Sequence, residues 1–338
     1  MRAAVYTGAG GPEVISIRDV SRPEPGAEQV SVRVLASGLN RADLLQRMGR
    51  YPAPPGAPAD IPGLEFVGVV DATGPGVAAF QPGRRVFGLA AGGGQAEFVV
   101  SHERLLVAVP DALDTIQAAA VPEAFITAHD ALFTQAGLAP GERVLIHAAG
   151  GGVGATAVQL AHAAGCVVFA TTRTPSKVAR IQALGADVVV DASREDFAAV
   201  VARATGGEGV HVCIDFVGAA YLAQNLAALA VKGRMVEVGT LSGADARIDL
   251  GLILRKRLHL IGTALRARPL EEKIAATRLF AERVLPQVAR GLARPSSSPD
   301  WVRPIVDRVF PLDALAEAHR YMASDAAFGK IVIRIAGE

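Results

Sequence analysis

The chain has 338 residues, a formal net charge of +1 and 51% hydrophobic residues, enough apolar material for two substantial cores. Because near-neutral charge gives no field to gather nucleic acid or an anionic membrane, we expect neither as a partner. The N-terminus alternates like a strand instead of forming a signal peptide, and no apolar run could span a bilayer. We therefore expect a soluble, cytoplasmic protein.

The sequence pattern of the first part of the chain, before the glycine cluster at 150–154, is typical of a compact, mainly β domain. One helix is predicted over 41–48, with Leu44, Leu45 and Met48 on one face and Gly49 at its end. The glycine-rich run 91–96 is interpreted as a loop between strands. Short apolar runs broken by glycine and proline predict strands at 3–6, 14–20, 30–36, 66–72, 85–89 and 97–100.

From residue 143 onward, strands alternate with helices. Strands are predicted at 144–148, 166–171, 187–190, 210–216, 234–239 and 258–263, and helices at 176–184, 195–205 and 222–231. This order predicts an α/β fold with a doubly wound parallel sheet, whose ligand lies beyond the carboxyl ends of the strands. The basic run Arg255-Lys256-Arg257 is interpreted as the solvated entry to the strand predicted at 258–263.

The end of the chain is predicted to fold back onto the first domain. Helices are expected at 270–290 and 312–322, a loop at 294–300 and a final strand at 330–335. The resulting domain boundaries are 1–122, 123–263 and a returning segment, 264–338.

A glycine cluster joins the strand at 144–148 to a helical pattern. Gly151, Gly152, Val153 and Gly154 stand where a phosphate-binding turn requires close backbone approach and exposed N–H groups. Ala149 takes the place of the first glycine of the strict motif. The predicted ligand is a dinucleotide.

Two scarce residue types also carry information. Cys166 and Cys213 lie in apolar strands, which predicts buried free thiols and no disulfide framework. Lysine is rare in a chain that otherwise prefers arginine, so each retained lysine could have a specific role, although codon bias would give the same ratio. The lysines are at positions 177, 232, 256, 273 and 330.

Several motifs resemble the medium-chain dehydrogenases and reductases, and within them the zinc-free quinone oxidoreductases related to zeta-crystallin. The resemblance runs almost end to end, and Leu39–Asp43, Tyr51–Gly56 and Leu254–Arg268 are most similar to the tumour-suppressor-induced members of animals. The other motifs are Gly10–Glu13, Pro62–Glu65, Gly93–Glu97, Ala118–Glu123, the glycine turn and Phe328–Val332.

The resemblance implies a GroES-like catalytic domain, a Rossmann domain and usually a homodimer built through the cofactor domains. It also implies cofactor contacts at Asn40, Thr127, Gly239, Leu265 and Lys330. Alternatives remain open for three of them. Asn40 could cap the helix that begins at Arg41, Thr127 could be an ordinary helix hydroxyl, and Lys330 could be a solvated residue at the start of the last strand.

Ligand chemistry predicts that the chain binds no zinc. A catalytic zinc needs converging Cys, His or carboxylate ligands, whereas zinc-dependent relatives have a cysteine where this chain has Asn40, and Gly-His-Glu where it has Gly63-Leu64-Glu65. Alcohol oxidation without a Lewis acid is therefore not expected. An electron-poor carbonyl acceptor such as a quinone or an enone accepts hydride without a metal.

The coenzyme is predicted to be NADPH. The segment after the second strand contains Thr172, Arg173 and Lys177 and no acidic residue, as suits a 2′-phosphate. A solvated basic loop would look the same, and Ala192 stands where several relatives carry a tyrosine that helps to hold this phosphate.

For the chemical step we assign Tyr51 and Asn40. Tyr51 lies in a proline-rich loop whose counterparts line the substrate cleft, although packing of its ring is equally compatible with the sequence. Three hypotheses follow: an NADPH-dependent quinone reductase first, an NADPH-dependent enone or enoyl reductase second, and a non-catalytic NADPH-binding protein third. The sequence does not give the physiological acceptor, the number of electrons per step or the assembly beyond a dimer.

Overall fold

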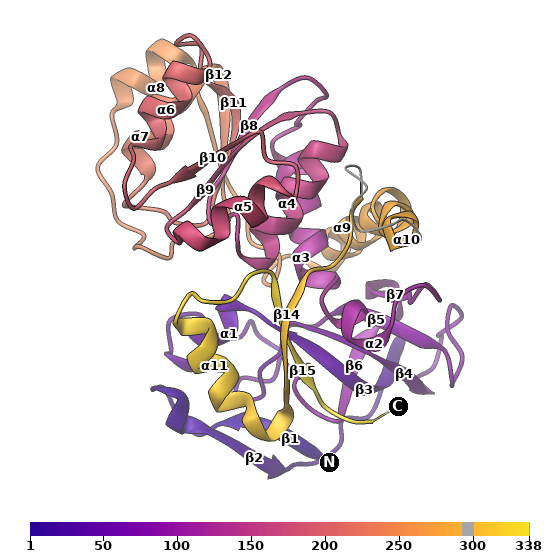
Figure 1. Ribbon diagram of the computed structural model, residues 1–338. Helices are drawn as coiled ribbons and strands as arrows, with labels where there is room; N and C mark the ends of the chain where they lie inside the picture. The colour runs from indigo at the N-terminus through magenta and orange to yellow at the C-terminus, as the bar shows by residue number, and fades with distance from the viewer. Residues whose placement is uncertain (293–300, 338) are drawn as a thin grey trace. The chain divides into compact units, whose positions relative to one another are not determined.

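The computed structural model describes residues 1–292 and 301–337, so the loop predicted over 294–300 lies outside the described residues. The described chain forms two compact units (Figure 1). The first unit comprises residues 1–126, 265–292 and 304–337, and the second comprises residues 127–264 and 301–303. The boundaries after residues 126 and 264 differ from those predicted after 122 and 263, because helix α3 (Pro122–His129) runs through the first boundary unbroken.

The second unit is built on a parallel six-stranded sheet, which confirms the predicted fold class. Its spatial order is β10-β9-β8-β11-β12-β13, and each neighbouring pair is parallel. The order reverses between β8 and β11, where doubly wound sheets bind ligands. The strands are β8 (Arg143–Ile146), β9 (Val167–Thr172), β10 (Val188–Asp191), β11 (Val210–Asp215), β12 (Leu229–Glu237) and β13 (His259–Gly262).

Helices cover both faces of this sheet. Right-handed crossovers place α4 and α5 on one face and α6, α7 and α8 on the other, as Figure 1 shows. Buried Leu145, Phe169 and Cys213 pack against Phe197 and Leu229 to form a core on the second of these faces. The helices are α4 (Gly152–Ala163), α5 (Val178–Gln182), α6 (Phe197–Ala204), α7 (Leu222–Ala228) and α8 (Leu250–Lys256).

Two predictions in this region are wrong. The helix predicted over 222–231 ends at Ala228, because Leu229 already begins β12. Arg255 and Lys256 of the basic run end α8 and Arg257 is its C-cap residue, while the first turn of α8 is capped by the Asp249 carboxylate, which accepts the Leu252 N–H at 2.9 Å. Lys256 is not simply solvated: its Nζ donates to the carbonyls of Leu226, Ala227 and Leu229 at 3.1, 2.7 and 2.6 Å, and so stabilises the end of α7.

The first unit is mainly β, as predicted. Strands β1 (Arg2–Tyr6) and β2 (Ile15–Asp19) pair antiparallel, and a larger sheet has the order β14-β15-β3-β4-β5-β7 with β6 also pairing β3. Its interior is rich in valine and includes Val30, Val32 and Phe66. The strands are β3 (Gln29–Leu39), β4 (Glu65–Thr73), β5 (Arg85–Leu89), β6 (Phe98–His102), β7 (Leu106–Ala108), β14 (Val306–Pro311) and β15 (Lys330–Arg334).

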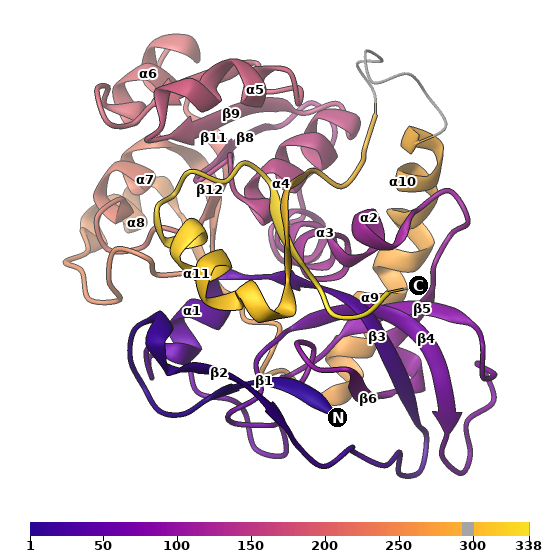
Figure 2. The same cartoon turned by 60° about the horizontal axis from the view of Figure 1, so that its bottom comes forward.

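The last strand lies beside the third. β15 pairs antiparallel with β3 in a register that sets Ile331 opposite Leu39, and Figure 2 shows the yellow C-terminal strands next to the indigo strand β3. Lys330 therefore lies next to the end of β3, where the chain continues to Asn40 and helix α1 (Arg41–Arg47). The carboxyl-terminal part of the chain thus supplies a side chain to the amino-terminal domain.

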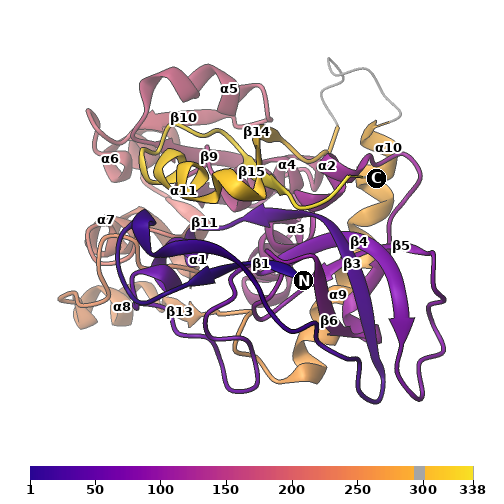
Figure 3. The same cartoon turned by 90° about the horizontal axis from the view of Figure 1, so that it is seen from below.

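The helices of the first unit depart from the sequence pattern in two places. The helix predicted over 270–290 is two helices, α9 (Leu270–Arg283) and α10 (Leu285–Leu292), which follow one another in Figure 3. α1 buries Asp43, Gln46 and Arg47 beside Leu44, whereas Met48 is exposed. The remaining helices are α2 (Thr115–Ala119) and α11 (Leu315–Ala323).

The cysteines are as predicted: Cys166 and Cys213 are both buried and unpaired. Across residues 1–292 and 301–337, no helix combines the length and the apolar composition needed to cross a membrane.

Candidate active site

The predicted glycine turn connects β8 to α4 in the second unit. Ala148 has a φ of +46°, in the left-handed region, and its carbonyl oxygen lies under the start of the helix. A Cβ at Gly154 would lie 2.4 Å from this oxygen, and one at Gly151 would lie 3.3 Å from it. Gly154 therefore admits no side chain, whereas Gly151 has slightly more room.

The same turn presents backbone donors. α4 begins at Gly152, so the N–H groups of Gly152, Val153 and Gly154 belong to its first turn and have no acceptor one turn back in the helix. Together with the helix dipole they favour an anion at the carboxyl edge of the sheet. The turn therefore has the features that a pyrophosphate requires.

A row of hydrogen-bonded, buried polar side chains begins at His147, the residue directly before the turn. His147 follows β8, and its Nδ1 lies 2.8 Å from the hydroxyl of Thr171 in β9. Its Nε2 lies 2.7 Å from Oδ1 of Asn225 in α7, whose Nδ2 donates to Asp215 at 2.8 Å. Because Asn225 donates to the carboxylate, its oxygen accepts from His147, which fixes the imidazole as the Nε2–H tautomer. Burial lowers the pKa of His147, so the ring is neutral.

The row continues to a second carboxyl group. Asp215 lies in register with Glu237 on β12, and it accepts the backbone N–H groups of Val217 at 2.7 Å and Gly218 at 3.2 Å. Burial, together with the negative charge of Asp215, raises the pKa of Glu237 to about 8. Glu237 is therefore protonated at neutral pH, and within the described chain its Oε1 has no hydrogen-bond partner.

The predicted 2′-phosphate loop follows β9. The Thr172 hydroxyl accepts the backbone N–H of Thr174 at 3.1 Å and closes the loop. Arg173 is exposed, whereas Lys177 is largely buried at the start of a short helical turn, Pro175–Lys177. The backbone of Ala192 donates to the Thr172 carbonyl at 2.9 Å, so β10 supports this loop through its main chain.

The first unit contains a buried cluster of Asn40, Glu65 and Lys330. The Lys330 ammonium donates to Oε1 of Glu65 at 2.6 Å, to Oδ1 of Asn40 at 2.6 Å and to the Leu39 carbonyl at 3.0 Å. Lys330 is 4% exposed and Glu65 is fully buried. The structure thus overturns the alternative that Lys330 is solvated.

The cluster uses nearly all of its hydrogen-bonding groups internally. Nδ2 of Asn40 donates to Glu65 at 2.9 Å and to the Gly38 carbonyl at 3.3 Å, and Oε2 of Glu65 accepts the Glu123 N–H at 2.8 Å. A Cβ at Gly38 would lie 2.2 Å from Oε1 of Glu65. All three N–H donors of Lys330 are therefore used in hydrogen bonds, and one of them holds the Asn40 carboxamide in place.

Asn40 is also the N-cap residue of helix α1 and forms a capping box with Asp43, the third residue of the helix. Asp43 accepts the backbone N–H of Asn40 at 2.8 Å, and its other oxygen accepts the Gly63 N–H at 3.2 Å. Burial is the main reason that the pKa of Asp43 rises to about 6. Helix α1 and the loop before Glu65 are thereby joined next to the cluster.

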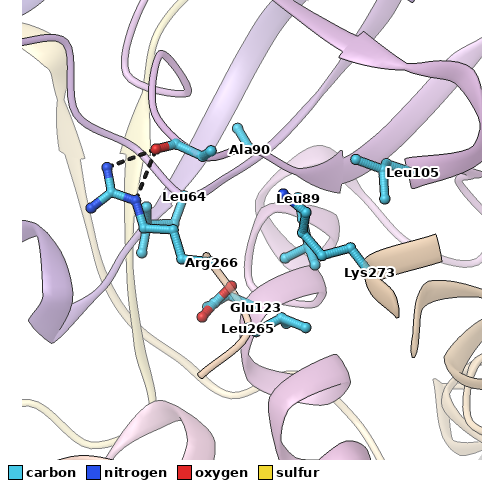
Figure 4. A pocket seen from close by; sticks show the side chains of 9 residues that line it. Leu64, Leu89, Ala90, Leu105, Glu123, Leu265, Arg266 and Lys273 are labelled. Atoms are coloured by element: carbon cyan, nitrogen blue, oxygen red, sulfur yellow. Dashed lines mark hydrogen bonds between the residues drawn. The ribbon is translucent and has the colours of Figure 1, made fainter. Parts of the chain in front are cut away.

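Tyr51 packs near Arg266, which lines a small cavity in the first unit. The guanidinium carbon is 5.3 Å from the centre of the Tyr51 ring. Arg266 also donates from Nε and Nη2 to the Ala91 carbonyl at 2.8 and 2.7 Å, the dashed bonds of Figure 4, and to Gln46 at 2.8 Å. Burial raises the pKa of Tyr51, so its hydroxyl stays protonated.

The remaining predicted residues lie in both units. Thr127 is half-buried in α3, and Gly239 follows β12 in the second unit. Leu265 is buried in the first unit, where it lines the cavity of Figure 4.

Sequence reasoning missed several residues of the site. It did not identify Glu65 as the partner of Lys330, Arg266 as a neighbour of Tyr51, or Lys273 in the cavity wall. The scarcity of lysine was a signal for Lys273, whereas the Glu65–Lys330 pair joins residues 265 positions apart and has no local signature. Among the residues that the structure describes, no group of three or more His, Cys, Asp or Glu side chains could hold a metal ion.

Two family models match the chain. A zinc-binding dehydrogenase model matches residues 152–282, and an alcohol dehydrogenase GroES-like domain matches residues 26–111. Among curated proteins, the chain is 31% identical over 336 residues to a quinone oxidoreductase of Rattus norvegicus, covering 98% of this chain and 97% of that protein. It is 33% identical over 337 residues to a mycocerosic acid synthase-like polyketide synthase of Mycobacterium tuberculosis, covering 99% of this chain but 15% of that far longer protein.

Solved structures have the same fold. The Escherichia coli quinone oxidoreductase complexed with NADPH is 27% identical with a TM-score of 0.87, and the match covers 99% of this chain and 100% of that one. The CurK enoyl reductase is 30% identical with a TM-score of 0.86, and the match covers 99% of both chains.

Proposed function

The chain belongs to the medium-chain dehydrogenase/reductase superfamily, whose NAD(P)H-dependent oxidoreductases share its fold, and we propose that it is a zinc-independent NADPH:quinone reductase. The observation that carries this proposal is the Asn40–Glu65–Lys330 cluster, in which the Asn40 amide stands where zinc-dependent relatives have a cysteine ligand and is bonded to the Lys330 ammonium. The finer likeness to the tumour-suppressor-induced members remains part of the proposal.

The residues of the second unit fit NADPH. The glycine turn offers N–H donors to the pyrophosphate. It also offers a surface without side chains, because a Cβ at Gly154 would lie 2.4 Å from the Ala148 carbonyl oxygen. Thr172, Arg173 and Lys177 would hold the 2′-phosphate, and Gly239 and Thr127 would lie along the nicotinamide half. When bound, the coenzyme supplies hydride. The chain's own part is to orient it and to balance its charge.

The donor set supports the zinc independence that we propose. A zinc site needs three or four ligands drawn from Cys, His and carboxylates, and here Glu65 is already paired with Lys330. A metal ion beside the buried ammonium would be repelled at short range. In the proposed function, the zinc-binding description holds for other members of the matched family, and an electron-poor acceptor takes the place of Lewis-acid activation.

The second candidate is an NADPH-dependent enone or enoyl reductase. It is favoured by the similarity to CurK enoyl reductase, which is as close in identity as the similarity to quinone oxidoreductases. A conjugated ketone and a quinone both place negative charge on oxygen after accepting hydride. A non-catalytic NADPH-binding protein is the third candidate.

A panel of acceptors tests the proposal. Loss of nicotinamide absorbance is followed with p-benzoquinone, with a cyclic enone and with neither, at matched NADPH and NADH concentrations. We expect fast oxidation of NADPH with the quinone, slower oxidation with the enone and little with NADH. Faster turnover of the enone would favour the second candidate, and coenzyme binding without any oxidation would favour the third.

We also propose a homodimer formed through the second unit. β13 is an edge strand, and exposed Leu250, Leu254 and Leu260 lie on it and on the preceding helix α8. Leu254→Glu should convert the dimer to a monomer in light scattering. An unchanged mass for this variant, or a monomeric wild type, would contradict the proposed interface.

A further inference from the structure

One lysine of the first unit lies in an apolar cavity. Lys273 belongs to the first turn of α9, and its side chain extends toward Leu89 in Figure 4. Leu64, Leu105 and Leu265 line the same cavity, together with Leu89, Ala90, Ala91, Glu123 and Arg266. A positive charge thus stands among four leucine side chains.

Nothing in the described chain compensates this charge directly. Lys273 makes no hydrogen bond or ion pair there, in contrast to Lys256 with its three carbonyls and Lys330 with Glu65. Its helix neighbour Glu271 is held by Arg104 through two bonds of 2.8 Å. Burial lowers the pKa of Lys273, and the positive end of the α9 dipole acts in the same direction.

The other charged groups of the cavity have different orientations or partners. The Arg266 guanidinium is occupied by the Ala91 carbonyl and Gln46, and Glu123 lies in the first turn of α3, where its backbone N–H donates to the Glu65 carboxylate. Neither group contributes to the pKa shift of Lys273, which arises from burial alone. Lys273 is therefore a proton-bearing group whose N–H donors are available to a ligand.

The size of the cavity limits what it can receive. Its total space is about 310 Å³ including the open mouth, and the space of about 20 Å³ that a water molecule can occupy within it holds about one water molecule. That room suits a single oxygen atom at the tip of a ligand, with the apolar remainder against the leucines.

We propose that this cavity is the acceptor site and that Lys273 is a catalytic residue, which binds the carbonyl oxygen of a conjugated acceptor and protonates it. The inference rests on the proposed reductase function. With an enone, hydride bonds to the β-carbon, the C=C π pair shifts, and the C=O π pair moves to oxygen. The Lys273 Nζ–H bond breaks as the O–H bond forms, and the neutral amine regains a proton from water. With a quinone, the hydroquinone monoanion takes the same proton.

The first experiment needs no coenzyme. Wild type, Lys273→Met, Lys273→Arg and Lys232→Met are titrated with p-nitrophenol, whose phenolate mimics the oxyanion of the reduced acceptor and reports by absorbance. We expect the wild type to bind the phenolate, Lys273→Met to bind it about tenfold or more weakly, and Lys273→Arg to lie between them. Lys232 is exposed on strand β12 of the second unit, so Lys232→Met should match the wild type. Wild-type affinity in Lys273→Met, or no phenolate binding by any form, would overturn the proposal.

A titration of the lysines keeps the test open if Lys273→Met folds poorly. The amines of the wild type are methylated with ¹³C-formaldehyde and followed by NMR against pH, and the Lys273→Arg spectrum assigns the resonance. We expect Lys273 to titrate at lower pH than Lys232. Titration together with Lys232 would mean that the amine reaches water while only its stem is buried, and the proposal would fail.

Steady-state rates separate this inference from the proposed function. If Lys273→Met lowers kcat for an enone by about a hundredfold while the apparent constant for NADPH is unchanged, both stand. If the variant reduces every acceptor at the wild-type rate, the assignment of Lys273 is wrong and the reductase function survives. If the wild type binds p-nitrophenolate through Lys273 but none of the acceptors supports oxidation of NADPH, the binding site stands and the function is wrong.

Discussion

The glycine turn of the second unit and the buried cluster of the first unit are both polar, and they are assembled in different ways. The turn is contiguous, because Ala148 to Gly154 form it within one strand-to-helix connection. The cluster joins Asn40, Glu65 and Lys330, which arrive on the end of β3, the start of β4 and the start of β15. A site made from neighbouring residues is visible in the sequence, whereas a site made by strand pairing is visible only in the fold.

The largest expected effect concerns the cluster. Lys330→Met leaves the fully buried Glu65 without its cation and should lower the free energy of unfolding by about 3–5 kcal/mol. Chemical denaturation followed by circular dichroism measures the change. Arg2→Met, which breaks the exposed pair with Asp313, is the control and should cost less than about 1 kcal/mol. Equal losses in the two variants would show that the cluster is no more important than a surface ion pair.

The next effect concerns the contiguous region. Arg173→Ala and Lys177→Ala should weaken NADPH by tens- to hundreds-fold, on the order of the few kcal/mol expected for close charge pairs, and should leave NADH almost unchanged. Fluorescence titration with both coenzymes measures the ratio. Arg203→Ala removes an exposed arginine from α6 and serves as the control. A parallel loss for NADPH and NADH would remove the assignment of this loop to the 2′-phosphate.

A graded pair of variants tests the turn itself. Gly154→Ala forces a Cβ to 2.4 Å from the Ala148 carbonyl and should weaken both coenzymes by about tenfold, because the turn must shift. Gly151→Ala meets the same oxygen at 3.3 Å and should cost less. Calorimetric titration gives both affinities, and the reverse order would contradict the described geometry.

A buried histidine gives the first unit a pH dependence. Burial, and to a smaller extent Arg47, lowers the pKa of His319 to about 3, from 6.5 in an unfolded chain. Between these values the unfolded state binds the extra proton, so stability falls as the pH falls, by up to about 1.4 kcal/mol per pH unit. His319→Gln should flatten this slope in denaturation curves from pH 7 to pH 4. Exposed His259→Gln should not, and a slope that persists in His319→Gln would assign the acid sensitivity elsewhere.

The smallest effect is expected at Tyr51. Tyr51→Phe should reduce kcat by about tenfold or less, because a hydroquinone anion can take its proton from another donor or from water. The pH profile of kcat for p-benzoquinone measures this. A much larger loss, with coenzyme binding and circular dichroism unchanged, would assign the proton transfer to Tyr51 and not to Lys273.

Much of the fold followed from local patterns. Six apolar runs separated by helices predicted the parallel sheet of the second unit. In the first unit, β5 occupies the predicted residues 85–89. Helix α8 escaped prediction because Leu250 and Leu254 are exposed, so its pattern lacks a buried apolar stripe. Helix α1 was predicted, but its buried side is polar because Asp43, Gln46 and Arg47 bond to neighbouring loops.

The candidate site was predictable to a similar extent. The glycine turn and the basic loop could be located from sequence because each needs only a few consecutive residues. The row from Thr171 to Glu237 could not, because its members come from four strands and a helix, and each looks like an ordinary strand-end residue in isolation. Long-range pairing decides which of these polar groups meet.

The placement of Lys330 on the last strand has a consequence for biosynthesis. The amino-terminal half of β3 can pair with β4 and β6 as soon as they leave the ribosome, but Glu65 must wait for residue 330 before its charge is matched. The second unit has its sheet complete by residue 262. Translation therefore delivers the complete parallel sheet of the second unit while the first unit still lacks the cation that pairs with Glu65, and the last step of maturation is the docking of the closing strand.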